Sequence, residues 1–166
     1  MKIRLVFLLC LCFALKAQAQ LTKVEMYTDK VKSLSDTEKE KLESLLFGPV
    51  PQLQFKENGD PIFVWENEGP VKAIAISFNE IGVLKNVKFA SSFKTTEVIG
   101  INWEKGKPLP LKPDDLKQFK SLRYIVIKSM ESISIDELKK LLNELISSKE
   151  TSGQVEILYL KMQLPS

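Results

Sequence analysis

Four apolar runs with the alternation of buried strands recur in the second half of the chain. They span residues 71–78 (VKAIAISF), 96–103 (TEVIGINW), 122–129 (LRYIVIKS) and 155–162 (VEILYLKM). The alternate isoleucines Ile74, Ile99 and Ile125 are 25 and 26 residues apart, and Leu158 follows 33 residues later in the last run. Each interval is long enough for one strand and a connecting segment that leads back to the start of the next strand. This spacing predicts parallel strands joined by right-handed crossovers.

Two segments have the spacing of amphipathic helices and begin with a capping box. Ser35-Asp36-Thr37-Glu38 precedes leucines at 42, 45 and 46, and this helix is expected to end at Gly48-Pro49. Ser134 and Glu137 form the second box, which predicts a helix over 134–148. Its apolar stripe consists of Leu138, Leu141, Leu142, Leu145 and Ile146.

Short strands account for the rest of the N-terminal pattern. Residues 21–28 (LTKVEMYT) predict a short strand. Residues 52–65 alternate on either side of the turn sequence ENGD at 57–60, which predicts a β-hairpin. We therefore expect residues 20–70 to form an N-terminal cap of helix and hairpin. A repeat-like α/β region over 71–166 is expected to fold with this cap as one domain.

Residues 109–129 (LPLKPDDLKQFKSLRYIVIKS) resemble one unit of a leucine-rich repeat. The apolar positions of that repeat hold Leu116, Phe119, Leu122, Ile125 and Ile127, and Leu109-Pro110 stands where such repeats often carry Leu-Pro. The resemblance implies a curved solenoid whose apolar side chains point into the core and whose strand-lined face commonly binds other proteins.

The turn asparagine of that family is matched at one strand only. Asn79 occupies this position after the first strand, whereas the later strands have Glu104, Met130 and Gln163 there. The fold class we predict is therefore α/β: a short, irregular leucine-rich-repeat-like array of parallel strands with helical returns, preceded by the helix-and-hairpin cap.

The first residues have the pattern of a secretory signal peptide. Lys2 and Arg4 precede an apolar run over residues 5–15, and Ala17-Gln18-Ala19 places small residues at the cleavage positions. The run is well short of the roughly 20 residues that span a bilayer, so we expect no transmembrane anchor after cleavage. The prediction is signal peptide 1–19 and export to the periplasm or the outside of a bacterial cell.

Cleavage of this leader changes both charge and cysteine content. The leader contains three of the 24 basic residues and none of the 21 acidic ones, so the remaining chain is neutral. A neutral chain lacks the basic excess typical of nucleic-acid binding. Cys10 and Cys12 both lie in the leader, so the exported chain is expected to fold without a disulfide.

Residue types absent from the chain exclude several chemistries. It contains no histidine, and the part after the leader contains no cysteine, so zinc, copper, haem and iron–sulfur sites lack their usual ligands. Nucleophiles activated by histidine are excluded for the same reason. We therefore expect no cofactor, no metal and no enzymatic activity. The carboxylates that would serve a glycan hydrolase are Glu66, Glu68, Glu80 and Glu97.

The side chains between the core isoleucines define a candidate partner-binding face. If Ile125 and Ile127 face the core, alternate residues face the opposite side of the sheet. The predicted face consists of Val98, Asn102, Tyr124, Val126, Lys128, Ile157, Tyr159 and Lys161. Aromatic residues with a polar rim are typical of interaction surfaces. The same row is also compatible with a second buried face under the N-terminal region.

The functional hypothesis is an exported, non-enzymatic module that binds a protein or a cell-envelope component through this face. Nucleic acid is not an expected partner, and the oligomeric state is left open. Two alternatives accompany it: a small carboxylate-dependent hydrolase of envelope glycans, and an inhibitor or immunity-type protein that neutralises an exported enzyme.

Overall fold

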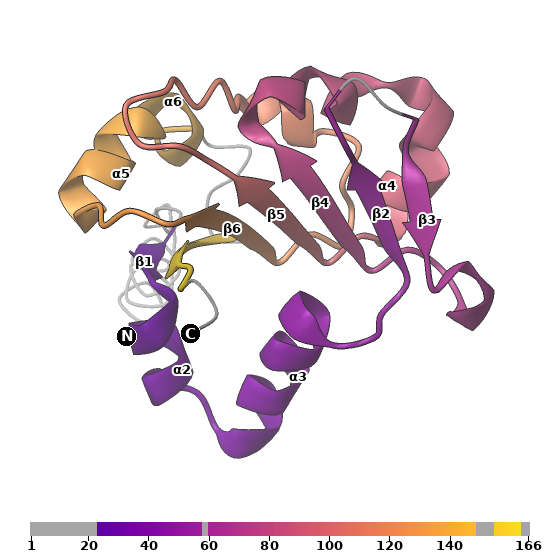
Figure 1. The fold of residues 1–166 in the computed structure, drawn as a ribbon, viewed down its shortest axis with the longest axis horizontal. Coiled ribbons are helices and arrows are strands. Elements are labelled where there is room, and N and C mark those ends of the chain that lie inside the picture. The colour runs from indigo at the N-terminus through magenta and orange to yellow at the C-terminus, as the bar shows by residue number, and fades with distance from the viewer. Residues whose placement is uncertain (1–22, 58–59, 149–154, 164–166) are drawn as a thin grey trace, which may run out of the picture.

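The computed structural model describes residues 23–57, 60–148 and 155–163, so the predicted signal peptide and the turn at 58–59 lie outside it. Its centre is a seven-stranded sheet in the order β1-β7-β6-β5-β4-β2-β3 (Figure 1). The strands are β1 (Val24–Met26), β2 (Gln52–Phe55), β3 (Ile62–Val64), β4 (Ala73–Ser77), β5 (Val98–Asn102), β6 (Tyr124–Ser129) and β7 (Glu156–Lys161). All neighbouring strands are parallel except the β2–β3 hairpin, which confirms the α/β class.

Short helices connect the strands. The α-helices are α2 (Tyr27–Ser33), α3 (Asp36–Phe47), α4 (Ala90–Thr95), α5 (Ile135–Leu141) and α6 (Asn143–Ile146). The 3-10 helices are η1 (Glu66–Glu68), η2 (Phe78–Lys85), η3 (Val87–Phe89) and η4 (Pro113–Leu116). Both predicted capping boxes are confirmed. The helix expected over 134–148 is interrupted at Leu142, whose backbone (φ −104°, ψ 17°) leaves the helical region.

Strand register confirms two of the three repeat intervals. Ile74, Ile99 and Ile125 are neighbours on β4, β5 and β6. On β7, however, Ile125 pairs with Ile157 and not with Leu158, so the predicted register was wrong by one residue. Side chains alternate along a strand, and the slip therefore exchanges the two faces of β7. The apolar pattern did not reveal it because this strand is buried on both faces.

Helices cover the two faces of the sheet unequally (Figure 1). One face packs under the crossover segments, where Phe93 of α4 and Leu138 of α5 join the core isoleucines. The other packs under α3, whose Leu42 and Leu45 contact a separate cluster. The sheet residues of that cluster are Ala73, Val98, Tyr124, Val126 and Leu158. Successive strands from β4 to β7 are added in one direction along the sheet, so right-handed connections between them all lie on the same face. The opposite face is covered by α2 and α3.

The N-terminal region contributes to both ends of the sheet. β1 pairs with β7 at one edge, whereas the β2–β3 hairpin extends the sheet at the other. Between them, α2 and α3 cross one face. Residues 23–57 and 60–70 are thus interleaved with the rest of the chain in a single sheet.

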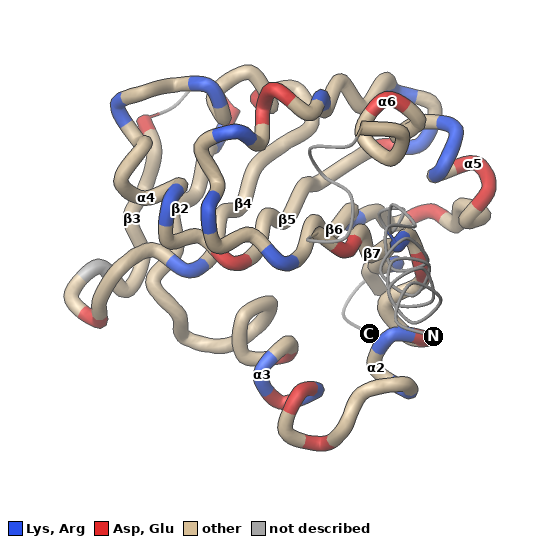
Figure 2. The backbone as a smooth tube through the Cα atoms, turned by 180° about the vertical axis from the view of Figure 1, so that it is seen from behind, with Lys and Arg blue, Asp and Glu red and all other residues tan. Residues whose placement is uncertain are grey.

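Charges are distributed over the whole molecule. Figure 2 shows acidic and basic residues interspersed along the chain, in keeping with its balanced composition. In the described ranges, no helix has both the length and the apolar content needed to cross a bilayer.

Candidate functional site

The eight residues predicted as one partner-binding face do not form one exposed surface. Val98, Tyr124 and Val126 are buried beneath α3. Ile157 and Tyr159 are buried on the opposite face because the β7 register differs from the predicted one. The members at the carboxyl ends of the strands remain more accessible: Asn102 and Lys161 are exposed, and Lys128 is half-buried. The alternation of residues along a strand does not reveal that α3 covers this face, because α3 comes from a distant part of the chain.

Tyr159 illustrates the consequence for β7. Its ring packs in the core beside the crossover helices, and its hydroxyl donates a hydrogen bond to the Glu131 carbonyl. Burial raises the pKa of this phenol. It serves as a buried anchor for the loop before α5.

Lys128 lies across Gly100 on the α3 side of the sheet. A Cβ at Gly100 would stand 3.2 Å from both Cε and Nζ of Lys128, so the absence of a side chain there gives the lysine its room. Burial lowers the pKa of the Lys128 ammonium, and no charged group of the described chain opposes this effect. The lysine therefore holds a partly desolvated charge without a carboxylate partner.

Replacement of this charge is expected to stabilise the protein. Lys128→Met keeps the apolar stem and removes the ammonium, which should raise the free energy of unfolding by about 1 kcal/mol at pH 7. The folded-state pKa is lower than the unfolded value, so wild-type stability rises as the pH increases through the folded pKa towards the ordinary value of 10.5. The gain should therefore shrink at alkaline pH.

Urea unfolding at pH 7 and pH 10 measures both effects. Lys139→Met, at an exposed position on α5, is the control and should change stability by less than about 0.5 kcal/mol. Equal stability of Lys128→Met and wild type at pH 7 would contradict the prediction.

The candidate catalytic glutamates are not brought together. Glu97 precedes β5 at the amino end of the sheet, whereas Glu80 lies in η2 beyond the carboxyl end of β4. Glu66 and Glu68 lie in η1, so the strand geometry that would align two carboxylates is absent.

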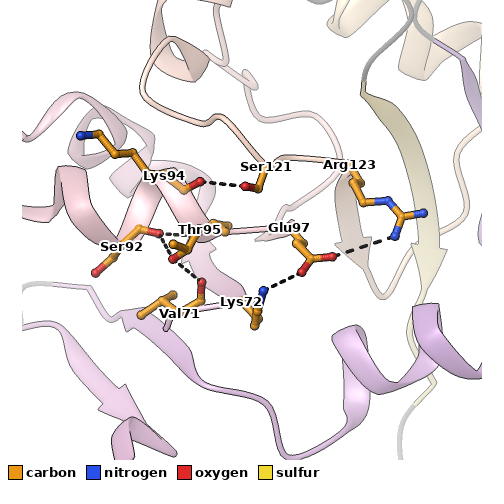
Figure 3. A network of polar contacts seen from close by, with 9 residues as sticks. Val71, Lys72, Ser92, Lys94, Thr95, Glu97, Ser121 and Arg123 are labelled. Atoms are coloured by element: carbon orange, nitrogen blue, oxygen red, sulfur yellow. Dashed lines mark hydrogen bonds and ion pairs between the residues drawn. The ribbon is translucent and has the colours of Figure 1, made fainter. Parts of the chain in front are cut away.

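Glu97 instead forms part of a structural row at the amino ends of the strands (Figure 3). Its Oε1 is 2.9 Å from Lys72 Nζ, and its Oε2 is 3.9 Å from an Arg123 guanidinium nitrogen. Backbone hydrogen bonds link the same three residues: the N–H of Glu97 donates to the Lys72 carbonyl, and the N–H of Arg123 donates to the Glu97 carbonyl. This carboxylate holds successive strands in register.

A cleft of the size of a ligand site lies at the other end of the sheet. It has a volume of about 630 Å³ and separates the loop after β5 from helix α5. Trp103, Ile133 and Leu141 supply apolar surface, and Lys105, Lys107 and Lys140 supply cations. Ligands of open parallel sheets bind outside the carboxyl ends of the strands, where this cleft lies. Its volume is in the range of ligand sites.

Hydrogen bonds hold the loop wall of the cleft. Trp103 follows β5 directly, and its indole Nε1 donates to the Lys107 carbonyl at 3.0 Å. Gly106 has a φ of 84°, the left-handed conformation that lets the chain turn between these residues. The backbone N–H of Lys105 donates to Glu131 Oε2 at 3.1 Å, and its Nζ donates to the Ser132 carbonyl at 2.9 Å. The loop is therefore tied to the segment that precedes α5.

The helix wall begins at the second capping box. Glu137 Oε2 accepts hydrogen bonds from the backbone N–H and the hydroxyl of Ser134, each at 2.9 Å, and these bonds lower the pKa of the Glu137 carboxyl. Lys140 and Leu141 follow one turn later. Leu141 is an exposed leucine at the mouth of the cleft.

The cleft has an excess of positive charge. Glu137 is its one lining carboxylate, against three lysines. Lys107 and Lys140 form no ion pair within the described chain. Figure 2 shows basic and acidic residues side by side on α5 and α6, so the excess of lysines is confined to the residues that line the cleft. Glu137 interacts with Lys105 and Lys140 and offsets part of their charge, and the rim keeps a net positive charge. An apolar floor with such a rim is suited to an amphipathic anion.

A smaller hollow adjoins this cleft along the helices. It has a volume of about 330 Å³ and shares Lys140 and Leu141 as lining residues. Lys112 and Glu144 line its far side, with Lys112 Nζ 3.9 Å from the Glu144 carboxylate. The two spaces follow α5 and α6 and form one elongated groove.

Sequence analysis missed this site. Trp103 is almost entirely buried, as an ordinary core residue would be. The one signal in the sequence was a tryptophan followed by a lysine-flanked glycine turn, WEKGK, at the end of a strand. Nothing in the sequence placed Lys140, 37 residues later, opposite that turn.

The described residues offer no metal site, and the comparisons with known proteins identify no relative. Within the described ranges, no group of three or more His, Cys, Asp and Glu side chains could hold a metal ion. Comparison of the chain with protein-family models, curated proteins and solved structures finds no significant match.

Proposed function

We propose that the protein is an exported, non-enzymatic binding module that holds an acidic polypeptide segment in the cleft between Trp103 and α5. The observation that carries this proposal is the combination of an apolar floor with unpaired Lys107 and Lys140 at the carboxyl ends of the parallel strands. Export belongs to the proposal and rests on the pattern of residues 1–19.

The shape of the groove favours a peptide over a compact small molecule. The α5 part of its wall, Ile135–Leu141, is about 10 Å long at the rise of an α-helix, and the second hollow extends the wall to Glu144 beyond the break at Leu142. An extended segment of about five residues covers the α5 part and reaches into the second hollow. One apolar side chain would lie against Trp103 and Leu141, and flanking carboxylates would reach the lysines.

The repeat-like architecture remains part of the same proposal. We interpret β4 to β7 as a short leucine-rich-repeat-like array with residues 20–70 as its cap. Its support is the 25- and 26-residue register of the isoleucines and the burial of Leu116, Phe119 and Leu122, which occupy the repeat's apolar positions.

Tryptophan fluorescence tests the binding proposal. The chain has two tryptophans, so Trp65→Phe leaves Trp103 as its sole indole. Titration with the capped peptide Glu-Leu-Glu-Phe-Glu should change the emission in a saturable way, with a dissociation constant of about 0.1 mM. The capped peptide Lys-Leu-Lys-Phe-Lys should not bind.

Adjacent lysines on α5 provide a matched pair of variants. Lys140→Glu, on the cleft, should weaken binding at least about tenfold because it reverses a charge that faces the peptide. Lys139→Glu makes the same change at an exposed residue that does not line the cleft, and should stay within about twofold. Equal losses in both variants would indicate a diffuse field and would contradict a site at Trp103. Equal binding of both peptides would contradict the acidic specificity.

A further inference from the structure

The edge of the sheet at β3 exposes an unusual amount of apolar surface. Ile62, Phe63 and Trp65 are 40%, 41% and 50% exposed. β3 pairs with β2 on one side, and no described strand pairs with its outer edge. Edge strands of soluble proteins are commonly protected by charged side chains, yet residues 62–65 contain none. This edge is therefore available to another strand.

A hollow next to Phe63 could receive a side chain of such a strand. It has a volume of about 240 Å³, enough for one large side chain, and Phe63, Val64 and Val71 form its apolar part. Ser91 also lines it. Recognition by strand addition takes its affinity from backbone hydrogen bonds and its specificity from pockets of this kind.

Trp65 ends the strand in a strained conformation. Its backbone is left-handed (φ 58°, ψ 33°), which is costly for a bulky residue. The Trp65 carbonyl accepts a hydrogen bond from the N–H of Glu68 at 3.1 Å. This turn stops β3 and leaves the indole half-exposed at its end, beside the open edge.

Charge distinguishes the possible occupants. Asp60 and Glu68 are exposed on either side of the apolar stretch, and neither forms an ion pair in the described structure. A second copy paired antiparallel about Phe63 would bring the acidic end of one chain against the acidic end of the other. A foreign strand with basic residues at its ends would be attracted instead.

We propose that the β3 edge binds an extended polypeptide segment by strand addition, and that this segment has an apolar centre flanked by Lys or Arg. The segment would continue the sheet beyond β3 and insert one apolar side chain beside Phe63. This surface is separate from the Trp103 cleft, and the proposal stands independently of the function assigned to that cleft.

Fluorescence anisotropy with a labelled peptide tests the surface. Labelled Lys-Val-Phe-Val-Lys should bind in a saturable way, and Glu-Val-Phe-Val-Glu should bind at least about tenfold more weakly. Phe63→Glu should weaken binding of the basic peptide at least about tenfold. Val87→Glu makes a similar apolar-to-acidic change at a residue 81% exposed in η3, and should stay within about twofold. Equal losses in the two variants would overturn the proposal.

Backbone methylation of the peptide separates strand addition from side-chain docking. In an added strand, every second N–H group points towards β3 and the others point away from it. N-methylation of the groups that point towards β3 should reduce binding at least about tenfold. N-methylation of the groups that point away should leave binding within about twofold. Hydrogen exchange should slow at those amides of residues 62–65 that point away from β2. Equal binding of both methylated peptides, or slowed exchange at 103–108 instead, would overturn it. Analytical ultracentrifugation tests for the other occupant. If the protein sediments as a dimer and Phe63→Glu converts it to a monomer, the occupant of the edge is a second copy of this chain, and the proposal of a foreign strand is overturned.

Discussion

Val126→Lys is expected to lower the free energy of unfolding by at least about 3 kcal/mol. Val126 has no exposed surface and lies in the cluster that joins the sheet to Leu42 and Leu45 of α3. A lysine there would bury an ammonium without a partner or would force α3 away from the sheet. Either outcome removes much of the packing on that face, because this helix supplies its main cover.

Urea unfolding of Val126→Lys beside Val87→Lys measures this effect. Val87 is 81% exposed, so the same substitution there should change stability by less than about 0.5 kcal/mol. A loss below about 1 kcal/mol for Val126→Lys would mean that α3 does not cover the strands in solution. The strand face first suggested by the sequence would then be open to a partner, and the Trp103 cleft would lose its status as the leading site.

Phe93→Ala is expected to cost about 3–5 kcal/mol. Phe93 is fully buried at the centre of an aromatic cluster on the crossover side of the sheet. Its ring stacks on Phe119 at a centroid distance of 4.9 Å and tilts against Phe89 at 6.1 Å. Truncation would leave a cavity between α4 and the segment after η4, and it would remove both ring contacts.

Phe47→Ala is the matched control for this truncation. Phe47 is 61% exposed at the end of α3, although its ring meets Tyr27 edge-on at 6.0 Å. Its loss should cost less than about 1 kcal/mol in the same unfolding experiment. Similar costs for the two substitutions would show that the crossover layer is not packed as described.

The two proposed binding surfaces make opposite demands on their ligands. The Trp103 cleft has a lysine rim and should select acidic segments, whereas the β3 edge is flanked by Asp60 and Glu68 and should select basic ones. Lys140→Glu should therefore leave binding of the basic peptide unchanged, and Phe63→Glu should leave binding of the acidic peptide unchanged. Each proposal can fail without the other.

Elements governed by neighbouring residues could be predicted from the sequence. The capping boxes at Ser35 and Ser134 depend on a hydroxyl and a glutamate three residues apart, and both helices begin there. The pairing of β2 with β3 and the intervals between Ile74, Ile99 and Ile125 follow from alternation in the same way. The returns between β4, β5 and β6 differ by one residue in length, so the sequence already contains the register of these strands.

Features that depend on distant segments needed the tertiary structure. β7 is apolar on both faces, so its own pattern did not specify whether Ile157 or Leu158 would pair beside Ile125. Burial of Val126 required α3 to fold back from 80 residues earlier in the chain. The cleft required Lys140 to face the loop after Trp103. Alternation along a strand defines two faces, but which of them meets water depends on what the rest of the chain packs against it.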